Sequence, residues 1–521
     1  MHISKNVYFY ININYINIKY MSKEKLCDKK MSFDECELAI LRMAVDKAEE
    51  KVGKNVVNSP EIKKIISILE NFLRKKSLIC YGGTALNNIM PKQDQFYNKD
   101  IEIPDYDFFS TNALNDAKEL CDNYLKEGFI EVEGKPGMHH GTFKVFVNFI
   151  PIADITFLHK DIFKEIKKEA IKVDSILYAP PNFLRMSMFL ELSRPEGDTS
   201  RFEKVLKRLN LLNKNYPLKS EHCEQAEFQR DMVGDLKNKD DVIFDNVRSS
   251  LINQGVIFFG GYAISLYSKY MPNNFKKKLK KYPDFDVLSE EPLRVAENIK
   301  ERLHDIGIKN VKIIKRNAIG EIIAAHYEIK IKNNTIAFIY EPIACHSYNE
   351  IKIQGDVVKI ATIDTILSFY LAFLYASREY YDNNRILCMA QYLFTVQQEN
   401  RLKQKGLLKR FSIHCYGHQQ TIEELRAEKA KKFAELKDKK GTPEYDEYFL
   451  RYRPGDKKIK NDVNDVNDVN NKNLNNKYKR NTKKYRNNNN NSNKYKKTFR
   501  KNNYLQELLK KRKTKKNHIF F

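Results

Sequence analysis

The sequence predicts an α+β protein that holds two related domains in tandem, the second degenerate, followed by a disordered basic tail. A hydrophobic strand ending in a Gly-Gly turn occurs twice, and each time a strand with the pattern Asp-x-Asp follows. Helical and strand-like hydrophobic patterns surround both copies, which is typical of mixed sheets flanked by helices. With 521 residues, the chain also exceeds what one hydrophobic core supports.

Positive charge is concentrated at the C-terminal end. The net charge is +25, and residues 456–521 contain 21 Lys and Arg against 5 Asp and Glu, which leaves +9 on residues 1–455. A basic body with a basic tail favours a polyanionic partner, most simply nucleic acid, although such a tail serves solubility equally well. Because the tail is rich in Asn and Lys, it is predicted to be disordered. Its tyrosines among the cations are compatible with single-stranded RNA.

The cysteines and the hydropathy indicate a compartment. Eight scattered cysteines form no C-x-x-C pair, so no zinc site is expected and a reduced, intracellular compartment fits best. Cys80 and Cys345 lie in apolar runs and are interpreted as core residues. The run His414–His418 is interpreted as a structural turn. Since no uninterrupted apolar stretch reaches 18 residues, no membrane association is expected.

The first copy of the motif holds the candidate site. Glycine at Gly82 and Gly83, followed by Thr84, lets backbone N–H groups approach a phosphate closely. Asp105 and Asp107 lie at i and i+2 of a short strand, so both carboxylates point to one face. Two such groups repel each other unless a cation lies between them, and hard oxygen ligands suit Mg²⁺ or Mn²⁺. This pattern predicts a site for a metal-bound triphosphate.

Asp154 is the predicted third carboxylate. It is the single acid within the apolar run Phe149–Phe157, a predicted strand. A carboxylate there costs free energy unless it has a cation or strong hydrogen bonds. Standing alone, Asp154 would more often be a solvent-facing residue; beside the Gly-Gly and Asp-x-Asp patterns it is interpreted as a metal ligand.

Periodicity and capping predict the other elements. A helix begins at Ser32, with Glu35 completing a capping box. Further helices are expected over 60–76, 111–127, 181–194, 198–214, 217–245, 364–380, 384–397 and 421–440, and strands over 128–133 and 144–148. Two of these helices carry cations that could line a phosphate or RNA path, although a solvated helix face is the commoner role for each: Arg185, Arg201, Lys204, Lys207 and Arg208.

The second half of the chain repeats this pattern. Gly260 and Gly261 match the first Gly-Gly turn, and Asp284 and Asp286 match the first Asp-x-Asp pair. The segment Glu341–Cys345 lines up with 150–154, so a thiol, which is a poor Mg²⁺ ligand, replaces the third carboxylate. Tyr262 replaces Thr84 and would crowd a triphosphate. The second copy is therefore expected to be inactive, to pack on the first or to bind RNA, and to keep its aspartates for structural reasons.

Domain boundaries follow from these patterns. They are 1–31 (flexible extension), 32–216 (first domain), 217–245 (connecting helix), 246–401 (degenerate second domain), 402–454 (charged helical segment) and 455–521 (disordered tail). Residues 1–20 lack the features of a signal peptide, and we expect them to be dispensable, as a mis-assigned start before Met21.

The Gly-Gly-Thr turn, Asp105, Asp107 and Asp154 together resemble the signature of polymerase-beta-like nucleotidyltransferases. The half-degenerate duplication and the segment Leu192–Leu209 resemble the poly(A) polymerase catalytic subunit of poxviruses and especially of giant cytoplasmic DNA viruses. The resemblance runs from Ser32 to Arg401 and leaves out both tails. Where the superfamily usually has Ser, this chain has Thr84, which keeps the hydroxyl.

The resemblance implies template-independent transfer of AMP from ATP to mRNA 3′ ends by a two-metal mechanism. Two ions, Mg²⁺ or Mn²⁺, would be held by Asp105 and Asp107, with Asp154 on the ion that activates the RNA 3′-hydroxyl, while the Gly-Gly-Thr turn would bind the triphosphate. The resemblance also implies a homodimer, or alternatively a viral processivity subunit as partner. The implied location is the host cytoplasm or virus factory, with packaging in the virion as a further option.

Two other functions stay open at this point. The same core could serve CCA addition, uridylation, or cyclic-nucleotide or oligoadenylate synthesis. From a different class, the chain could be a catalytically dead RNA-binding scaffold, against which the intact set of three aspartates speaks.

Overall fold

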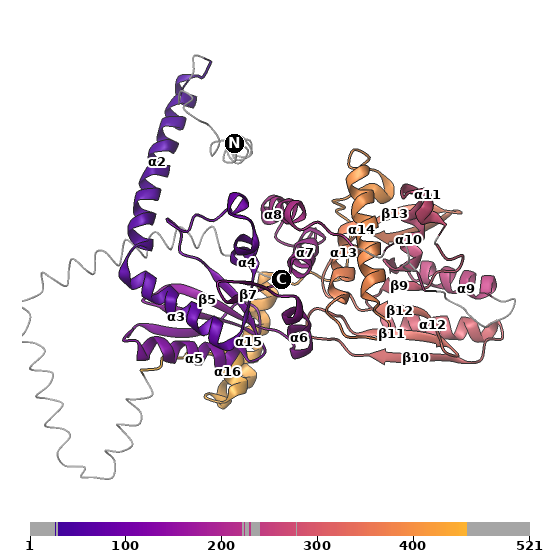
Figure 1. The fold of residues 1–521 in the computed structure, drawn as a ribbon. Helices are drawn as coiled ribbons and strands as arrows, with labels where there is room; N and C mark the ends of the chain where they lie inside the picture. Colours follow the sequence, from indigo (N-terminus) through magenta and orange to yellow (C-terminus); the bar gives the residue numbers. More distant parts are fainter. Residues whose placement is uncertain are drawn as a thin grey trace, which may run out of the picture. The chain divides into compact units, whose positions relative to one another are not determined.

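The computed structural model describes residues 27, 30–220, 223, 229–230, 240–277 and 279–455 (Figure 1). The predictions for residues 1–20 and for the basic tail lie outside the described residues. The chain divides into two compact units, one drawn from Met1–Lys64 and Tyr97–Ile103, the other from Ile65–Phe96 and Pro104–Phe521.

The smaller unit holds helix α2 (Phe33–Val57), which begins at the predicted capping box. The backbone N–H of Ser32 donates to Glu35 Oε2 at 2.8 Å, and the backbone N–H of Glu35 donates to Ser32 Oγ at 3.3 Å. Near the end of the helix, a Cβ on Gly53 would lie 2.5 Å from the carbonyl oxygen of Ile101. Glycine therefore lets the chain around Ile101 lie directly on α2.

The larger unit contains a seven-stranded sheet in the order β3-β4-β5-β2-β1-β7-β6. Strand β2 pairs antiparallel with β1 and parallel with β5, and β1 pairs parallel with β7. The strands are β1 (Ile79–Tyr81), β2 (Tyr106–Ser110), β3 (Val132–Pro136), β4 (Thr142–Val147), β5 (Ile150–Phe157), β6 (Ile171–Val173) and β7 (Ile176–Tyr178). The helices that accompany this sheet are α3 (Pro60–Lys76), α4 (Gly82–Ile89), α5 (Ala113–Lys126), α6 (Lys160–Glu169), α7 (Pro181–Leu192) and α8 (Phe202–Asn215).

An eight-stranded sheet follows, in the order β10-β11-β12-β9-β8-β14-β13-β15. Its first seven strands repeat the order of the first sheet, and the central pairings have the same directions: β8 with β9 antiparallel, β9 with β12 parallel, β8 with β14 parallel. The strands are β8 (Ile257–Phe258), β9 (Phe285–Leu288), β10 (Val311–Arg316), β11 (His326–Ile331), β12 (Asn334–Tyr340), β13 (His346–Ile353), β14 (Asp356–Ala361) and β15 (Cys415–Tyr416). The predicted mixed α+β fold with two mixed sheets is confirmed.

The helices of the second half follow the same plan. They are α9 (Asp240–Asn253), α10 (Gly261–Tyr267), α11 (Asn273–Lys276), α12 (Pro292–Asp305), α13 (Ile363–Phe373), α14 (Asn383–Glu399), α15 (Ile422–Leu436) and α16 (Pro443–Phe449). Short 3-10 helices are η2 (Lys92–Asp94), η3 (Thr199–Arg201), η4 (Ser268–Tyr270), η5 (Gly406–Leu408) and η6 (Lys437–Lys439). Every residue of α13 is buried, as its apolar sequence predicts. Its C-terminal extension contacts α7 of the first half, where the rings of Tyr375 and Phe183 lie 5.3 Å apart.

Four predicted elements are wrong in extent. The strand predicted over 128–133 begins only at Val132, and the helix predicted over 364–380 ends at Phe373. Phe149 is not in a strand but in a turn, with φ at 65°. No helix spans 217–245: the described residues 217–220 and 229–230 are not helical, and α9 starts at Asp240. Within this segment, the described residues Gln229 and Arg230 contact the second half of the chain, which local periodicity does not predict.

Residues 402–454 contain the charged helices α15 and α16, as predicted, and they also contact the first domain. Tyr452 exchanges two backbone hydrogen bonds with Gly134 on edge strand β3, at 2.8 and 3.0 Å. Asp446 pairs with Lys118 at 2.7 Å. This segment therefore covers the edge of the first sheet.

Six cysteines lie in three close pairs, with Cα–Cα distances of 5.2 to 5.3 Å: Cys27–Cys36, Cys223–Cys388 and Cys345–Cys415. Cys80 and Cys121 are free and buried. None of the described helices is both long and apolar enough to cross a membrane.

Candidate active site

The Gly-Gly turn connects β1 directly to α4. Gly82 has φ at 71°, a left-handed conformation that glycine adopts without strain. No side chain caps the N-terminus of α4, and helix N-termini bind anions through their free backbone N–H groups. Thr84 is buried, and its hydroxyl donates to the backbone carbonyl of Asp105 at 2.5 Å. Thr84 thus ties the turn to the segment that carries the carboxylates.

The three predicted aspartates lie on or directly before neighbouring strands. Asp107 on β2 is in register with Asp154 on the parallel strand β5, and Tyr81 on β1 is its partner on the other side. Residues in register on adjacent strands lie about 5 Å apart and point to the same face. Asp105 lies directly before β2, and its charge acts on Tyr81 together with those of Asp107 and Asp154. The assignment of the three aspartates as metal ligands stays a prediction.

This donor set fits a hard divalent cation. Asp107 is only 6% exposed and lies beside Asp154. Closely spaced carboxylates in a buried position require a compensating cation. These carboxylates, next to a turn suited to phosphate, match the oxygen ligands that Mg²⁺ and Mn²⁺ prefer.

Lys144 is a site residue that the sequence did not single out. It lies on β4 directly opposite Asp154, and the two side chains form an ion pair. Both are partly exposed, at 39% for Lys144 and 19% for Asp154. Alternation along β4 places Lys144 among half-exposed positions, so only the pairing of β4 with β5 reveals its proximity to the aspartates.

An aromatic wall borders the carboxylates. The ring of Tyr81 stacks on Phe109 at 3.9 Å, and its hydroxyl bonds to Thr156 Oγ1 at 2.8 Å. Burial, together with the charge of Asp107, raises the pKa of Tyr81 well above its ordinary value. Tyr81 therefore stays a neutral phenol that shields one side of Asp107 from water.

Arg185 is not placed to contact phosphate or RNA. It is 1% exposed, and its guanidinium donates to Asn213 Oδ1 at 2.8 Å, to Asn182 and to the carbonyl of Tyr216. Burial lowers its pKa to about 10. Arg185 joins α7 to the end of α8, a role that a basic residue on an amphipathic helix does not reveal by spacing alone.

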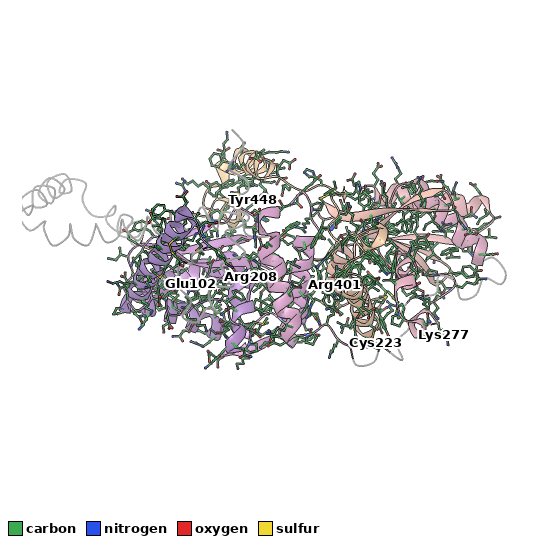
Figure 2. All side chains as sticks on the ribbon, turned by 90° about the horizontal axis from the view of Figure 1, so that it is seen from above. Glu102, Arg208, Cys223, Lys277, Arg401 and Tyr448 are labelled. Carbon is green, nitrogen blue, oxygen red and sulfur yellow. A yellow bond between two sulfur atoms is a disulfide. The ribbon has the colours of Figure 1, made fainter. Side chains whose placement is uncertain are left out.

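The other predicted cations lie on η3 and α8. Arg201 pairs with Glu191 at 3.3 Å, and Arg208, labelled in Figure 2, stacks its guanidinium 4.9 Å from the ring centre of Phe96. Lys204 is exposed on the same helix, and Lys207 pairs with Glu203 one turn away. These side chains form a basic face on α8 that stays a candidate RNA contact.

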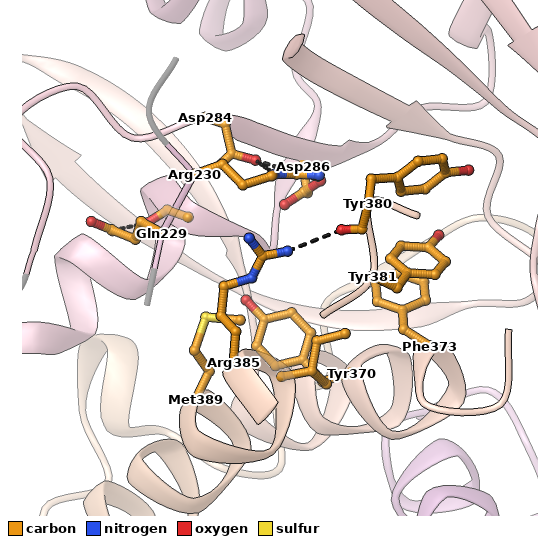
Figure 3. A pocket seen from close by; sticks show the side chains of 12 residues that line it. Gln229, Arg230, Asp284, Asp286, Tyr370, Phe373, Tyr380, Tyr381, Arg385 and Met389 are labelled. Carbon is orange, nitrogen blue, oxygen red and sulfur yellow. Dashed lines mark hydrogen bonds and ion pairs between the residues drawn. The ribbon is translucent and has the colours of Figure 1, made fainter. Parts of the chain in front are cut away.

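In the second copy, an arginine takes the place expected for a cation (Figure 3). Nε of Arg230 donates to Asp284 Oδ2 at 2.6 Å, and its Nη2 donates to Asp286 Oδ1 at 2.8 Å. Burial alone would lower the pKa of Arg230, but the two carboxylates together raise it. Burial, together with the charge of Asp284, raises the pKa of Asp286 to about 6, although Arg230 opposes this shift.

The position of the third carboxylate is occupied by Phe338, not by Cys345. Asp286 on β9 is in register with Phe338 on β12, as Asp107 is with Asp154. Cys345 lies beyond the end of β12 and pairs with Cys415. The shared letters Pro-Ile-Ala therefore misaligned the two copies, because strand register, and not a short identity, decides which side chains are equivalent.

The second Gly-Gly turn persists for a reason unrelated to phosphate. A Cβ on Gly260 would lie 1.9 Å from Asp286 Oδ2, and a Cβ on Gly261 would lie 2.7 Å from Asp284 Oδ1. Both glycines are thus required by the close approach of the carboxylates.

Comparisons of the sequence with known proteins point to one family. The profile of the family described as "Poly(A) polymerase catalytic subunit" matches residues 67–198. A protein of that name from African swine fever virus (isolate Pig/Kenya/KEN-50/1950) is 32% identical over 171 residues, which cover 32% of this chain and 36% of the relative. One from Acanthamoeba polyphaga mimivirus is 31% identical over 183 residues, which cover 34% of this chain and 30% of the relative. The matches thus span about a third of each of these curated relatives.

A solved structure extends the likeness in fold. The crystal structure of the Megavirus polyadenylate synthase superposes with a TM-score of 0.68, covering 86% of this chain and 93% of that chain at 20% identity. At this identity the likeness establishes the fold. The Gly-Gly-Thr turn and all three aspartates lie inside the matched residues 67–198, and the resemblance to the poly(A) polymerase catalytic subunit family is confirmed.

Proposed function

We propose that this chain is a template-independent poly(A) polymerase, which adds AMP from ATP to mRNA 3′ ends by two-metal nucleotidyl transfer. The observation that carries the proposal is the register of Asp107 with Asp154 beside the Gly82 turn. The names of the relatives that match residues 67–198, and the shared fold with a polyadenylate synthase, support it.

The residues of the first copy have separate roles in this mechanism. Asp105, Asp107 and Asp154 would hold two divalent ions, Mg²⁺ or Mn²⁺, which when bound neutralise the triphosphate and lower the pKa of the RNA 3′-hydroxyl. The backbone N–H groups at the start of α4 bind the triphosphate, and Thr84 fixes that turn against Asp105. Catalysis then consists mainly of positioning and charge neutralisation.

RNA binding is proposed to use the basic face of α8. Arg201, Lys204 and Arg208 lie on η3 and α8 of the same copy as the aspartates. Phosphate contacts of this kind weaken as salt rises, because bound counterions are released on binding. We further propose a homodimer, with a separate viral processivity subunit as the alternative, acting in the host cytoplasm or virus factory.

Nucleotide selectivity tests the proposal. The protein is incubated with an RNA primer, Mg²⁺ or Mn²⁺, and each radiolabelled nucleoside triphosphate in turn. Selective incorporation of ATP into long tails is expected. Short CCA-like products or preferential UTP incorporation would instead identify another nucleotidyltransferase, and RNA binding without any incorporation would identify a scaffold.

A further inference from the structure

The second copy keeps an acidic pair that no mechanism uses. Asp284 is 2% exposed and the side chain of Asp286 is 14% exposed, and the two stand at i and i+2 beside a Gly-Gly turn. In the first copy, the same arrangement calls for a divalent cation. In the second copy, the cation within hydrogen-bond distance is Arg230, 54 and 56 positions earlier in the chain.

The described neighbours of Arg230 all favour a guanidinium at this position. Its guanidinium spans both carboxylates and lies 4.6 Å from the ring centre of Phe338, the residue that replaces the third carboxylate. The backbone N–H of Asp284 donates to the carbonyl of Arg230 at 3.3 Å. An aromatic ring favours a guanidinium over its face and offers no ligand to a metal. The second copy therefore has Phe338 where the first has the carboxylate of Asp154, and it has an arginine where the first would hold a metal ion.

Little space is left for a nucleotide. The cavity beside Arg230 measures about 30 Å³, far below the roughly 300 Å³ at which small-molecule pockets begin. Figure 3 shows it lined by Tyr370, Tyr381 and Arg385, whose guanidinium donates to the carbonyl of Tyr380 at 3.0 Å. The second site is thus filled by side chains of the chain itself.

Other described residues before Arg230 in the chain also contact the second copy. Gln229 donates to the carbonyl of Gly261 at 2.6 Å and to Ser265 Oγ at 2.7 Å, and it accepts from the backbone N–H of Lys280 at 2.8 Å. Nearer the first copy, Ser220 bonds to Gln391 and Asn384 on α14, both at 2.9 Å. Arg230 is therefore one of the described residues between the two copies, with Ser220 and Gln229, that contact the second copy.

We propose that Arg230 is the resident cation of the second copy: its guanidinium occupies the place of divalent ions, makes this copy independent of metal and attaches the connecting segment to it. Removal of Arg230 then opens a divalent cation site at Asp284 and Asp286. A buried acidic pair without its guanidinium needs another cation, and Mn²⁺ is a hard ion that carboxylates bind.

Mn²⁺ binding tests the proposal without reading activity, so the result does not depend on whether the first copy transfers nucleotides. The full chain with Asp107→Asn and Asp154→Asn serves as the background, and free Mn²⁺ is measured by EPR. The background is expected to bind no Mn²⁺ at the second copy. Adding Arg230→Ser is expected to create about one site per chain, which a further Asp286→Asn removes.

Thermal unfolding gives the second readout. Arg230→Ser is expected to lower the Tm by about 10 °C without metal and to recover much of this with Mn²⁺, whereas the background does not respond. Where Arg230→Ser fails to fold, the neutral variant with Arg230→Met, Asp284→Asn and Asp286→Asn is expected to fold without metal and to ignore Mn²⁺. Mn²⁺ binding that depends on Asp286 while Arg230 is intact would overturn the proposal. A folded Arg230→Ser protein with no Mn²⁺ site would overturn it equally.

Discussion

The two copies place an acidic strand beside a Gly-Gly turn in the same sheet topology, and they neutralise its charge differently. In the first copy, Asp107 faces a second acid, Asp154, across parallel strands, and the cluster calls for an external cation. In the second copy, Asp286 faces Phe338, and Arg230 supplies the positive charge. One register position thus places a second acid, paired with Lys144, beside Asp107 in the first copy and an aromatic ring beside Asp286 in the second.

The two glycines retained in the second copy have a structural role. Gly260 and Gly261 persist because the side chains of Asp286 and Asp284 would collide with a Cβ there. A Gly-Gly turn with Asp-x-Asp therefore does not by itself indicate catalysis. The partner across the parallel strand distinguishes the two cases.

The largest expected difference between the copies is in activity. Asp107→Asn is expected to lower AMP incorporation by about a thousandfold or more, because it removes a charge that positions the metal-bound triphosphate. Its matched control, Asp286→Asn, is expected to change incorporation by about twofold at most. Primer extension with labelled ATP measures both, and circular dichroism confirms folding. A comparable loss in Asp286→Asn would erase the distinction between the copies.

Much of the difference between the two copies could be predicted from the sequence, but the roles of Arg230 and Phe338 could not. The duplicated topology, the capping box at Ser32 and the three aspartates follow from local patterns that chemistry and periodicity constrain. Arg230 lies 54 positions from Asp284, so only the folded structure identifies it as the partner of that carboxylate. Phe338 shares no motif with Asp154, so only the strand register identifies the two as equivalent. Arg185 shows the same limit, because burial between helices, and not its spacing, decides its role.

Acidification is expected to loosen the second copy first. Burial lowers the pKa of His326 to about 4 and that of His346 to about 3, whereas His139 of the first copy is half-buried and shifted in the same direction. A depressed histidine pKa stabilises the fold above the unfolded value of about 6.5, and this is lost as pH falls towards the folded value. For His326 the loss amounts to roughly 3 kcal/mol.

Hydrogen exchange at pH 7 and pH 5 measures this effect in each copy. Asp286, whose pKa is raised to about 6, acts in the opposite sense, so the informative quantity is the difference between variants. His326→Gln is expected to reduce the acid sensitivity of the second sheet and to leave the first unchanged. Equal acid sensitivity with and without His326 would rule out this histidine as the cause.

A smaller effect is expected at the turn. Thr84→Val removes the hydrogen bond to the carbonyl of Asp105 and should lower kcat about tenfold, since a buried acceptor loses its partner. Thr84→Ser keeps the hydroxyl and should stay close to the unaltered protein. At the equivalent position, Tyr262 instead accepts from Arg248 Nε at 2.8 Å, so Tyr262→Phe should not affect AMP incorporation. Steady-state kinetics on ATP compare the three variants.

The smallest expected effect separates an ion pair from a metal ligand. Lys144 neutralises Asp154 from the neighbouring strand and so competes with any divalent ion for that carboxylate. Lys144→Met is expected to lower the half-saturating Mg²⁺ concentration by about threefold, in line with the modest strength of partly exposed pairs. Lys135, in register with Lys144 on β3 and paired with Glu133, provides the matched control Lys135→Met, for which no shift is expected. A Mg²⁺ dependence that shifts in Lys144→Met but not in Lys135→Met would locate metal binding at Asp154. The second copy has Phe338 at the equivalent position, so it offers no carboxylate for which a lysine and a metal ion could compete.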